Sequence, residues 1–195
     1  MNPTLLALPA AFGLAGASGL NASLPLLIVS VLARLGLIHL ASPYDALASD
    51  VAFYGLIVLA IVEFAIDKIP ILDSIGHAVM LPVAAASGAI LFASQTGAVS
   101  NVDPGLQVLA SLLVGGSFAG IVHVARSAVR PVLNGILLGP PVSLVEDASS
   151  ALLSLAAALA PFLVPVVFVA LVVGVVMLWQ RRRTRATGPR LTGAR

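Results

Sequence analysis

Residues 148–180 read ASSALLSLAAALAPFLVPVVFVALVVGVVMLWQ and contain no Asp, Glu, Lys or Arg. Segments that are equally free of charge precede Arg34, lie between Asp73 and Asp103, and lie between Asp103 and Arg126. A run of roughly 18 or more apolar residues is long enough to cross the ~30 Å hydrocarbon core of a bilayer as a helix. The sequence therefore predicts an integral membrane protein with several transmembrane helices.

The overall composition excludes the soluble classes of protein. Of 195 residues, 59% are hydrophobic and 9% are charged, and the mean hydropathy is +1.10, whereas a soluble domain has about 25% charged residues. Aromatic residues make up only 5%, so the chain lacks the stacking platforms that bind nucleic-acid bases, and no nucleic-acid partner is expected. The absence of cysteine excludes disulfides, thiolate nucleophiles and cysteine-based metal sites.

Two apolar stretches, residues 4–40 and 106–138, are too long for single spans. The first has small residues in its middle together with Asn21 and Pro25, and the second has a glycine-rich middle at residues 115–120. Such a segment either packs a helix closely against a neighbour or breaks it. Further helices are expected between and after these stretches: one capped by Asp50 that continues to Glu63, one over residues 75–94, one from Ser143 to Ala160 with Glu146 and Asp147 in its first turn, and a last one that ends at Trp179.

The two halves of the chain follow the same plan. Each has an overlong, glycine-interrupted stretch, then a helix opened by an acid, then a third helix. An odd number of helices per repeat places the second copy upside down in the membrane, which is the inverted repeat common in transporters. At about 20 residues per span, the predicted fold is an all-α transmembrane bundle of about six spans in one domain, residues 1–180. Its two inverted three-helix repeats, residues 4–94 and 105–180, have broken first helices.

The distribution of basic residues predicts the orientation. Six of the ten basic residues lie within residues 181–195, directly after an apolar run. Basic residues are enriched in cytoplasmic segments, so both termini are expected in the cytoplasm, with Lys68, Arg126 and Arg130 on the same side and Arg34 outside. The chain is then a multi-pass membrane protein, and residues 181–195 are a disordered cytoplasmic tail.

Three passages resemble one known family. They are ASGLNASLPLL at residues 17–27, which leads to ARLG at 33–36, EFAIDKIPILD at 63–73, and PVSLVED at 141–147. They are similar to the bacterial integral membrane family catalogued as domain of unknown function 4126. The string E-x-x-x-D-K-x-P-x-x-D is the specific part, and the resemblance covers nearly the whole chain except the arginine tail. It implies a membrane fold and no particular activity.

Glu63 is the strongest candidate for a functional residue. At ~1.5 Å per residue from Asp50, it lies about 20 Å along its helix, inside the hydrocarbon slab. An ionised carboxylate there costs several kcal/mol unless it is paired, hydrated or protonated. We therefore interpret Glu63 as a proton carrier, a cation ligand or a substrate contact. The alternative is a structural ion pair or a protonated packing residue.

Asp67 lies one turn beyond Glu63 on the same helix face. Two carboxylates at that spacing repel when both are ionised, so one should hold a proton or a cation should sit between them. Lys68 points elsewhere and is expected to reach toward the membrane interface. Asp73 and His77 are four residues apart and suggest a metal site with these acids. An N-cap and an interfacial histidine explain them better, so no metal is expected.

His123, Arg126 and Arg130 form one stripe at the cytoplasmic end of the fourth helix. They either bind an anionic substrate, pair with Glu63 and Asp67, or anchor the helix at the interface. Because an unpaired charge is penalised in low-dielectric surroundings, at least one acid should approach this stripe. Two further polar residues, Ser18 and Asn21, lie at the expected break in the first stretch, where they contact either a substrate or a neighbouring helix.

The leading hypothesis is a secondary transporter or channel-like protein for a small solute or ion. Its site comprises Glu63, Asp67 and the broken stretches, and protons or small cations are the expected coupling ions. The alternatives are a non-catalytic membrane scaffold or assembly subunit, and a membrane enzyme acting on lipid headgroups. No enzyme signature is present, so no catalytic activity and no cofactor are expected. The expected partners are the lipid bilayer and an unidentified solute or ion, with homo-oligomerisation left open.

Overall fold

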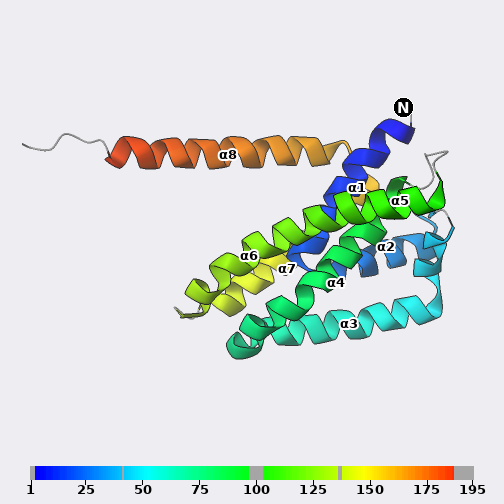
Figure 1. Cartoon of the computed structure of the whole chain (residues 1–195), viewed down its shortest axis with the longest axis horizontal. Coiled ribbons are helices and arrows are strands. Elements are labelled where there is room, and N and C mark those ends of the chain that lie inside the picture. Colours follow the sequence, from blue (N-terminus) through cyan, green and yellow to red (C-terminus); the bar gives the residue numbers. More distant parts are fainter. Residues whose placement is uncertain (1–2, 41, 97–102, 136–137, 187–195) are drawn as a thin grey trace, which may run out of the picture. The chain divides into compact units, whose positions relative to one another are not determined.

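The computed structural model describes residues 3–40, 42–96, 103–135 and 138–186, apart from some side chains within the helices. Within these ranges the regular structure is entirely helical, without strands (Figure 1). The chain divides into two compact units, Met1–Val164 and Pro165–Arg195. The predicted all-α class is therefore confirmed for the described residues.

The first unit is built around its first helix. α1 contacts α4, α6 and α7, whereas α2 lies against α3 and α7, and these helices lie close together in Figure 1. The elements of this unit are α1 (Pro3–Leu20), α2 (Leu24–Arg34), the 3-10 helix η1 (Tyr44–Ala48), α3 (Asp50–Lys68), α4 (Pro70–Thr96), α5 (Pro104–Ser111), the π-helix η2 (Leu112–Gly116), α6 (Ser117–Gly135) and α7 (Gly139–Leu159).

The second unit consists of α8 (Leu163–Ala186), which begins at the end of the first unit. This helix includes the predicted last span and runs on through residues 181–186, which the sequence predicts as part of a disordered tail. The side chain of Trp179 and those of the tail arginines are outside the described part of the chain, as are residues 187–195 altogether.

The two overlong apolar stretches behave differently. The first is broken at residues 21–23, between α1 and α2, as predicted. The second is not broken, because α5, η2 and α6 follow one another without a gap. Its Gly115 and Gly116 widen the helix into a π-turn that packs against α4. In the second stretch, glycine allows close packing against α4. In the first stretch, the Asn21 side chain accepts hydrogen bonds from free backbone amides, and Pro25 has no amide hydrogen to donate.

Three predicted helix starts shift. Ser49, and not Asp50, caps α3, because its hydroxyl accepts the hydrogen bond from the Ala52 amide. α4 begins at Pro70 and not near residue 75. α7 begins at Gly139, so Glu146 and Asp147 lie beyond its first turn and not in it. Proline is favoured in the first turn of a helix, and Pro140 and Pro141 lie in the first turn of α7.

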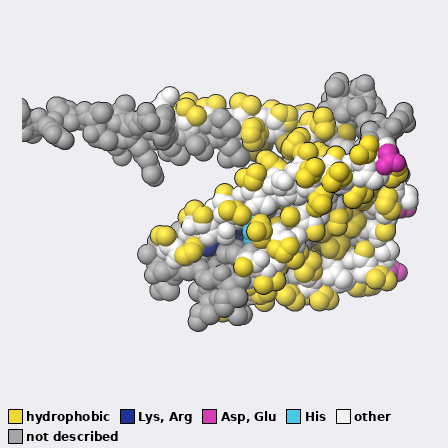
Figure 2. Space-filling view, viewed as in Figure 1, with side chains coloured by type: hydrophobic (Ala, Val, Ile, Leu, Met, Phe, Trp, Pro, Cys, Tyr) yellow, Lys and Arg dark blue, Asp and Glu magenta, His cyan; other side chains and the backbone are white. Residues whose placement is uncertain are grey.

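The surface has the character of a membrane protein. Among the described residues, three helical segments are long and apolar enough to cross a membrane: Ala78–Thr96, Pro104–Val132 and Gly139–Leu159. Shorter apolar helices cover Leu6–Leu20 and Leu24–Arg34. Hydrophobic side chains cover most of the described surface in Figure 2, where acidic side chains appear only at the edge. The number of six spans and the inverted repeat stay predictions.

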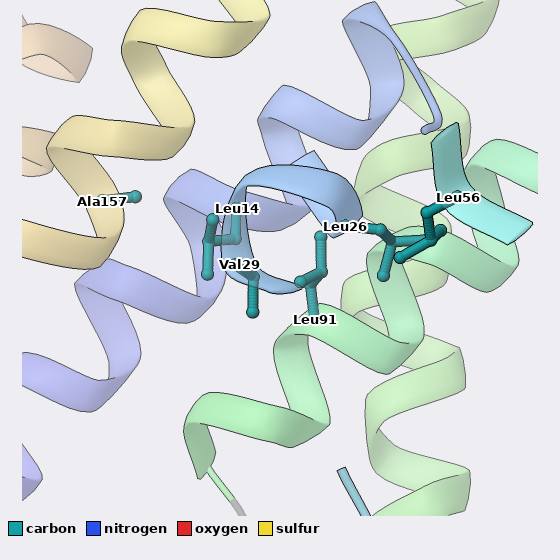
Figure 3. Close-up of a cluster of buried hydrophobic side chains, with 6 residues drawn as sticks. All are labelled: Leu14, Leu26, Val29, Leu56, Leu91 and Ala157. Atoms are coloured by element: carbon teal, nitrogen blue, oxygen red, sulfur yellow. The ribbon is translucent and has the colours of Figure 1, made fainter. Parts of the chain in front are cut away.

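The core of the first unit is small and apolar. Its main cluster joins α1, α2, α3, α4 and α7 through six buried side chains (Figure 3), namely Leu14, Leu26, Val29, Leu56, Leu91 and Ala157. Glycines allow the backbones to approach elsewhere. A Cβ atom added to Gly88 of α4 would lie 2.4 Å from Ala119 Cβ and 2.8 Å from the Gly115 carbonyl oxygen. Close packing of small residues is the usual way in which membrane helices associate.

Because of this contact, two glycine-to-alanine changes are expected to have opposite effects on the free energy of unfolding. Gly88→Ala should lower the free energy of unfolding by about 1–3 kcal/mol, because the added methyl group meets backbone that cannot move away without separating α4 from η2. The matched control is Gly55→Ala in α3, where an added Cβ has nothing within 4 Å and alanine favours the helix by up to about 1 kcal/mol. Unfolding in detergent compares the two. Equal stability of both variants would contradict the packing described here.

Candidate functional site

The break between α1 and α2 leaves the amides at the start of α2 without helical acceptors. Side chains accept their hydrogen bonds instead. Asn21 Oδ1 accepts from the Leu24 amide at 2.9 Å and from the Ser23 amide at 3.2 Å. Ser23 and Asn21 are both almost completely buried. The start of α2 is thus an inward-facing group of N–H donors, which carries the positive end of the helix dipole.

Glu63 of α3 binds this group of donors. Its Oε1 accepts from the Ala22 amide at 2.8 Å, and its Oε2 accepts from the Ser23 amide at 2.9 Å and from the Ser23 hydroxyl at 2.6 Å. The side chain is 1% exposed. A carboxylate is well suited to this place, because it offers only acceptors to three donors and its charge complements the helix dipole. Glu63 therefore holds the break from the α2 side.

Arg126 of α6 holds the other end of the break. Its Nη1 donates to the carbonyl oxygen of Leu20, the last residue of α1, at 2.5 Å. Its Nη2 pairs with Asp67 of α3, and its Nε donates to Glu146 of α7 at 2.8 Å. A cation is favoured at the C-terminal end of a helix. The expectation that an acid would meet the basic stripe is confirmed, and the acid is Asp67.

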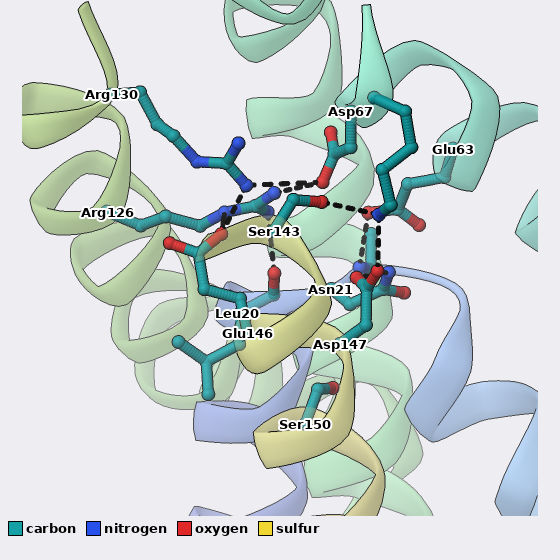
Figure 4. A network of polar contacts seen from close by, with 12 residues as sticks. Leu20, Asn21, Glu63, Asp67, Arg126, Arg130, Ser143, Glu146, Asp147 and Ser150 are labelled. Atoms are coloured by element: carbon teal, nitrogen blue, oxygen red, sulfur yellow. Dashed lines mark hydrogen bonds and ion pairs between the residues drawn. The ribbon is translucent and has the colours of Figure 1, made fainter. Parts of the chain in front are cut away.

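Arg130 lies one turn beyond Arg126 and completes this ion network. Its Nη2 pairs with Glu146 and lies 3.6 Å from Asp67 Oδ2. Figure 4 shows the two arginines and the two acids converging from three helices. Two carboxylates and two guanidinium groups thus neutralise one another in a buried place, which is the condition under which charges are tolerated there.

A second ion pair lies beside the first network. Lys68 Nζ donates to Asp147 Oδ2 at 2.8 Å and to the Ser143 hydroxyl at 2.6 Å, and it lies 4.0 Å from the centre of the Phe64 ring. The other carboxylate oxygen of Asp147 accepts from Asn21 Nδ2 at 3.0 Å. Asp147 and Ser143 of α7 therefore hold Lys68, and its predicted reach toward the membrane interface stays a prediction.

The network places opposite charges on opposite ends of the broken helix. Among the described side chains it contains four acids, Glu63, Asp67, Glu146 and Asp147, and three bases, Lys68, Arg126 and Arg130. The acid in excess is Glu63, whose hydrogen-bond partners are dipoles and not a cation. Protonation of one carboxylate would therefore make this set neutral.

The predicted site residues do not all join the network. Glu63, Asp67, Asn21, Arg126 and Arg130 come together at the break, as described above. Ser18 does not, since its hydroxyl donates to the Leu14 carbonyl of its own helix. His123 is buried on α6 at the position three residues before Arg126. Asp67 turns to the arginines, whereas Glu63 turns to the start of α2.

The sequence reasoning missed several participants. These residues are Ser23, Lys68, Ser143, Glu146 and Asp147. The available signal was the passage at residues 141–147, in which an apolar segment carries two adjacent acids and a serine four residues before Asp147. On a helix, residues four apart lie on the same face, so Ser143 and Asp147 together bind one ammonium group.

The described residues do not test the metal site that the sequence suggested. Within them, no group of three or more His, Cys, Asp or Glu side chains is placed to hold a metal ion. The side chains of Asp73 and His77, which the sequence suggested as ligands, lie outside the described part.

The fold and the site together define a helical membrane protein with a buried charge network at a helix break. The family model described as "Domain of unknown function (DUF4126)" matches residues 8–181. The chain belongs to this family, which confirms the resemblance seen in the sequence. Comparison with curated proteins and with solved structures found no match.

Proposed function

We propose that the protein is a secondary transporter for a small solute or ion, with its site at the break between α1 and α2. The observation that carries the proposal is the pair of opposite charges at this break. Glu63 binds the N-terminal end of α2, and Arg126 binds the C-terminal end of α1. Transporters use discontinuous helices in this way, since the free backbone groups and helix dipoles at the break bind substrates and coupling ions.

The ionisable residues of the site support this proposal. Acidic and basic groups inside membrane helices are costly, and they commonly mark ion or substrate pathways. Here the charged groups come from α3, α6 and α7, while the break belongs to α1 and α2. A change in the ion pairs would therefore move three helices relative to the break, which is the kind of rearrangement that alternating access requires.

One observation favours the alternative, a non-catalytic membrane scaffold. The charged side chains of α3, α6 and α7 pair with one another, and such networks also serve to hold helices together. The two functions differ in whether the break ever meets water. A transporter must expose it, and a scaffold need not.

Site-directed labelling tests this difference. The chain has no cysteine, so Ala22→Cys introduces a single thiol at the break, at a residue whose side chain is 1% exposed. The backbone amide of this residue still donates its hydrogen bond to Glu63 Oε1. In reconstituted vesicles, we expect a membrane-impermeant thiol reagent to label this cysteine, and to reach it from either face in different vesicle populations.

The control is Ala157→Cys, a fully buried position in the apolar cluster of α1 and α7. It should react at least about tenfold more slowly than Ala22→Cys, since no proposed pathway reaches it. Equal labelling rates at the two positions would refute the transporter proposal and leave the scaffold. The test needs no knowledge of the substrate.

A separate prediction concerns the orientation in the bacterial inner membrane. If both termini are cytoplasmic, reporter fusions should place the segment between α4 and α5 outside and a fusion after residue 180 inside, because basic residues favour the cytoplasm. The opposite result at either point would overturn this topology and, with it, the inverted-repeat prediction.

A further inference from the structure

We propose that the coupling ion is a proton, and that Glu63 and Ser23 together form its binding site at the break. This inference rests on the proposed transport function and names its ion. The starting observation is the Ser23 hydroxyl group. It has one hydrogen to donate and two acceptors in reach, Glu63 Oε2 at 2.6 Å and Asn21 Oδ1 at 3.2 Å.

These two acceptors give the site two complete hydrogen-bond patterns. With Glu63 ionised, the Ser23 hydroxyl donates to Glu63 Oε2, the shorter contact. When a hydronium ion transfers a proton to Oε2 and leaves as water, the new acid O–H donates to Ser23 Oγ, and the Ser23 hydroxyl turns to donate to Asn21 Oδ1. The only covalent bond that forms is the acid O–H bond. A hydroxyl group can change between donor and acceptor in this way because its hydrogen rotates about the C–O bond.

The surroundings favour a proton over a metal cation. A cation bound by a carboxylate needs further oxygen ligands around it. The atoms nearest to the Glu63 oxygens are instead the Ala22 and Ser23 amides and the Ser23 hydroxyl, all in positions to donate. The positive end of α2 would also repel a cation, whereas a proton becomes part of the carboxyl group.

The charges around Glu63 agree with uptake of one proton. Asp67 lies on the same helix, Asp147 of α7 is reached through Asn21, and Arg126 of α6 is paired with Asp67. The acidic residue of η1, Asp45, is exposed and its Tyr44 is half-buried, and α2 contributes Arg34, which pairs with Asp50 at the other end of α3. α4 contributes Asp73 and His77, whose side chains are not described.

The same hydrogen bonds connect the proton site to an ion pair. Asn21 accepts from Ser23 in the protonated pattern and donates to Asp147, which holds Lys68. The side chains of Lys68 and Asp147 are 20% and 10% exposed, against 3% and 7% for Arg126 and Asp67. Lys68 is therefore the most exposed charged side chain of the network, and its pair with Asp147 is the contact through which the state of Glu63 would be communicated to α7.

Infrared difference spectroscopy of the purified protein in lipid tests the inference. Acidification should produce a carboxylic acid C=O band that Glu63→Gln lacks. Ser23→Ala should move this band or its pH midpoint, since it removes the partner of the acid hydrogen. The matched control is Ser18→Ala, whose hydroxyl binds its own helix and whose spectrum should equal that of the wild type. If Glu63→Gln fails to fold, the difference between the two serine variants still assigns the band.

Replacing choline by sodium in the buffer distinguishes a proton-binding site from a cation-binding site. Sodium bound at Glu63 would compete with the proton, so a tenfold rise in its concentration would shift the midpoint by about one pH unit. We expect no shift. A sodium-dependent midpoint, the absence of the Glu63 band, or identical spectra for both serine variants would each overturn the proton site. If the Ala22→Cys variant is labelled even so, the transport proposal stands without a proton site at Glu63.

Discussion

Arg126→Met is expected to lower the free energy of unfolding in detergent by about 3–5 kcal/mol, the cost of removing one partner from a buried charge network. The side chain is 3% exposed, and it serves Asp67, Glu146 and the Leu20 carbonyl oxygen together. Without it, two carboxylates share Arg130 alone. The last carbonyl of α1 also loses its donor, and the α1 end of the break is no longer held.

A second substitution tests whether charge imbalance causes this loss. Asp67→Asn removes the acid that Arg126 neutralises, so the double variant Arg126→Met with Asp67→Asn should be more stable than the sum of the single effects predicts, by about 0.5–3 kcal/mol. Arg34→Met is the control for loss of an arginine as such. Its partner is Asp50, and the two side chains are 32% and 78% exposed, so it should cost less than about 1 kcal/mol. Additive effects in the double variant would show that Asp67 and Arg126 act independently.

The position of the break was predictable because its causes are local. Asn21 and Pro25 both disfavour a continuous helix, through a competing acceptor and a missing amide hydrogen. The glycine-rich middle of the second stretch has no such residue. Glycine only permits close approach, and whether a helix then breaks or widens depends on the helix against which it packs, here α4. That contact is not readable from the local sequence.

The partners of the charged residues were predictable only in part. Hydrocarbon forces charges to find opposite charges, so an acid meeting the stripe of Arg126 and Arg130 followed from charge alone. The partner of Glu63 did not, because the donors at the start of α2 exist only once the helix end is placed. The roles of Glu146 and Asp147 were missed for a related reason. With the start of α7 placed four residues too late, at Ser143 and not at Gly139, both acids were interpreted as part of a helix start.

The amides at the start of α2 give the most direct test of the role of Glu63. In the Glu63→Gln variant, one carboxylate oxygen becomes an NH₂ group, which cannot accept from the Ala22 or the Ser23 amide. Whichever way the new amide is oriented, at least one donor faces another donor. An unsatisfied buried donor costs about 1–3 kcal/mol, and this loss falls first on the break. Local opening of Ala22 and Ser23 should then be about 5- to 150-fold more frequent, since each 1.4 kcal/mol corresponds to a factor of ten.

Hydrogen–deuterium exchange of residues 20–27 measures this opening. Asp50→Asn is the matched control, because it makes the same chemical change in the same helix at an exposed residue, and its exchange at the break should equal that of the wild type. If Glu63→Gln also left the exchange of Ala22 and Ser23 unchanged, Glu63 would not hold the break. The start of α2 would then depend on Asn21 alone, and the proposed transport site and its proton would both lose the residue on which they rest.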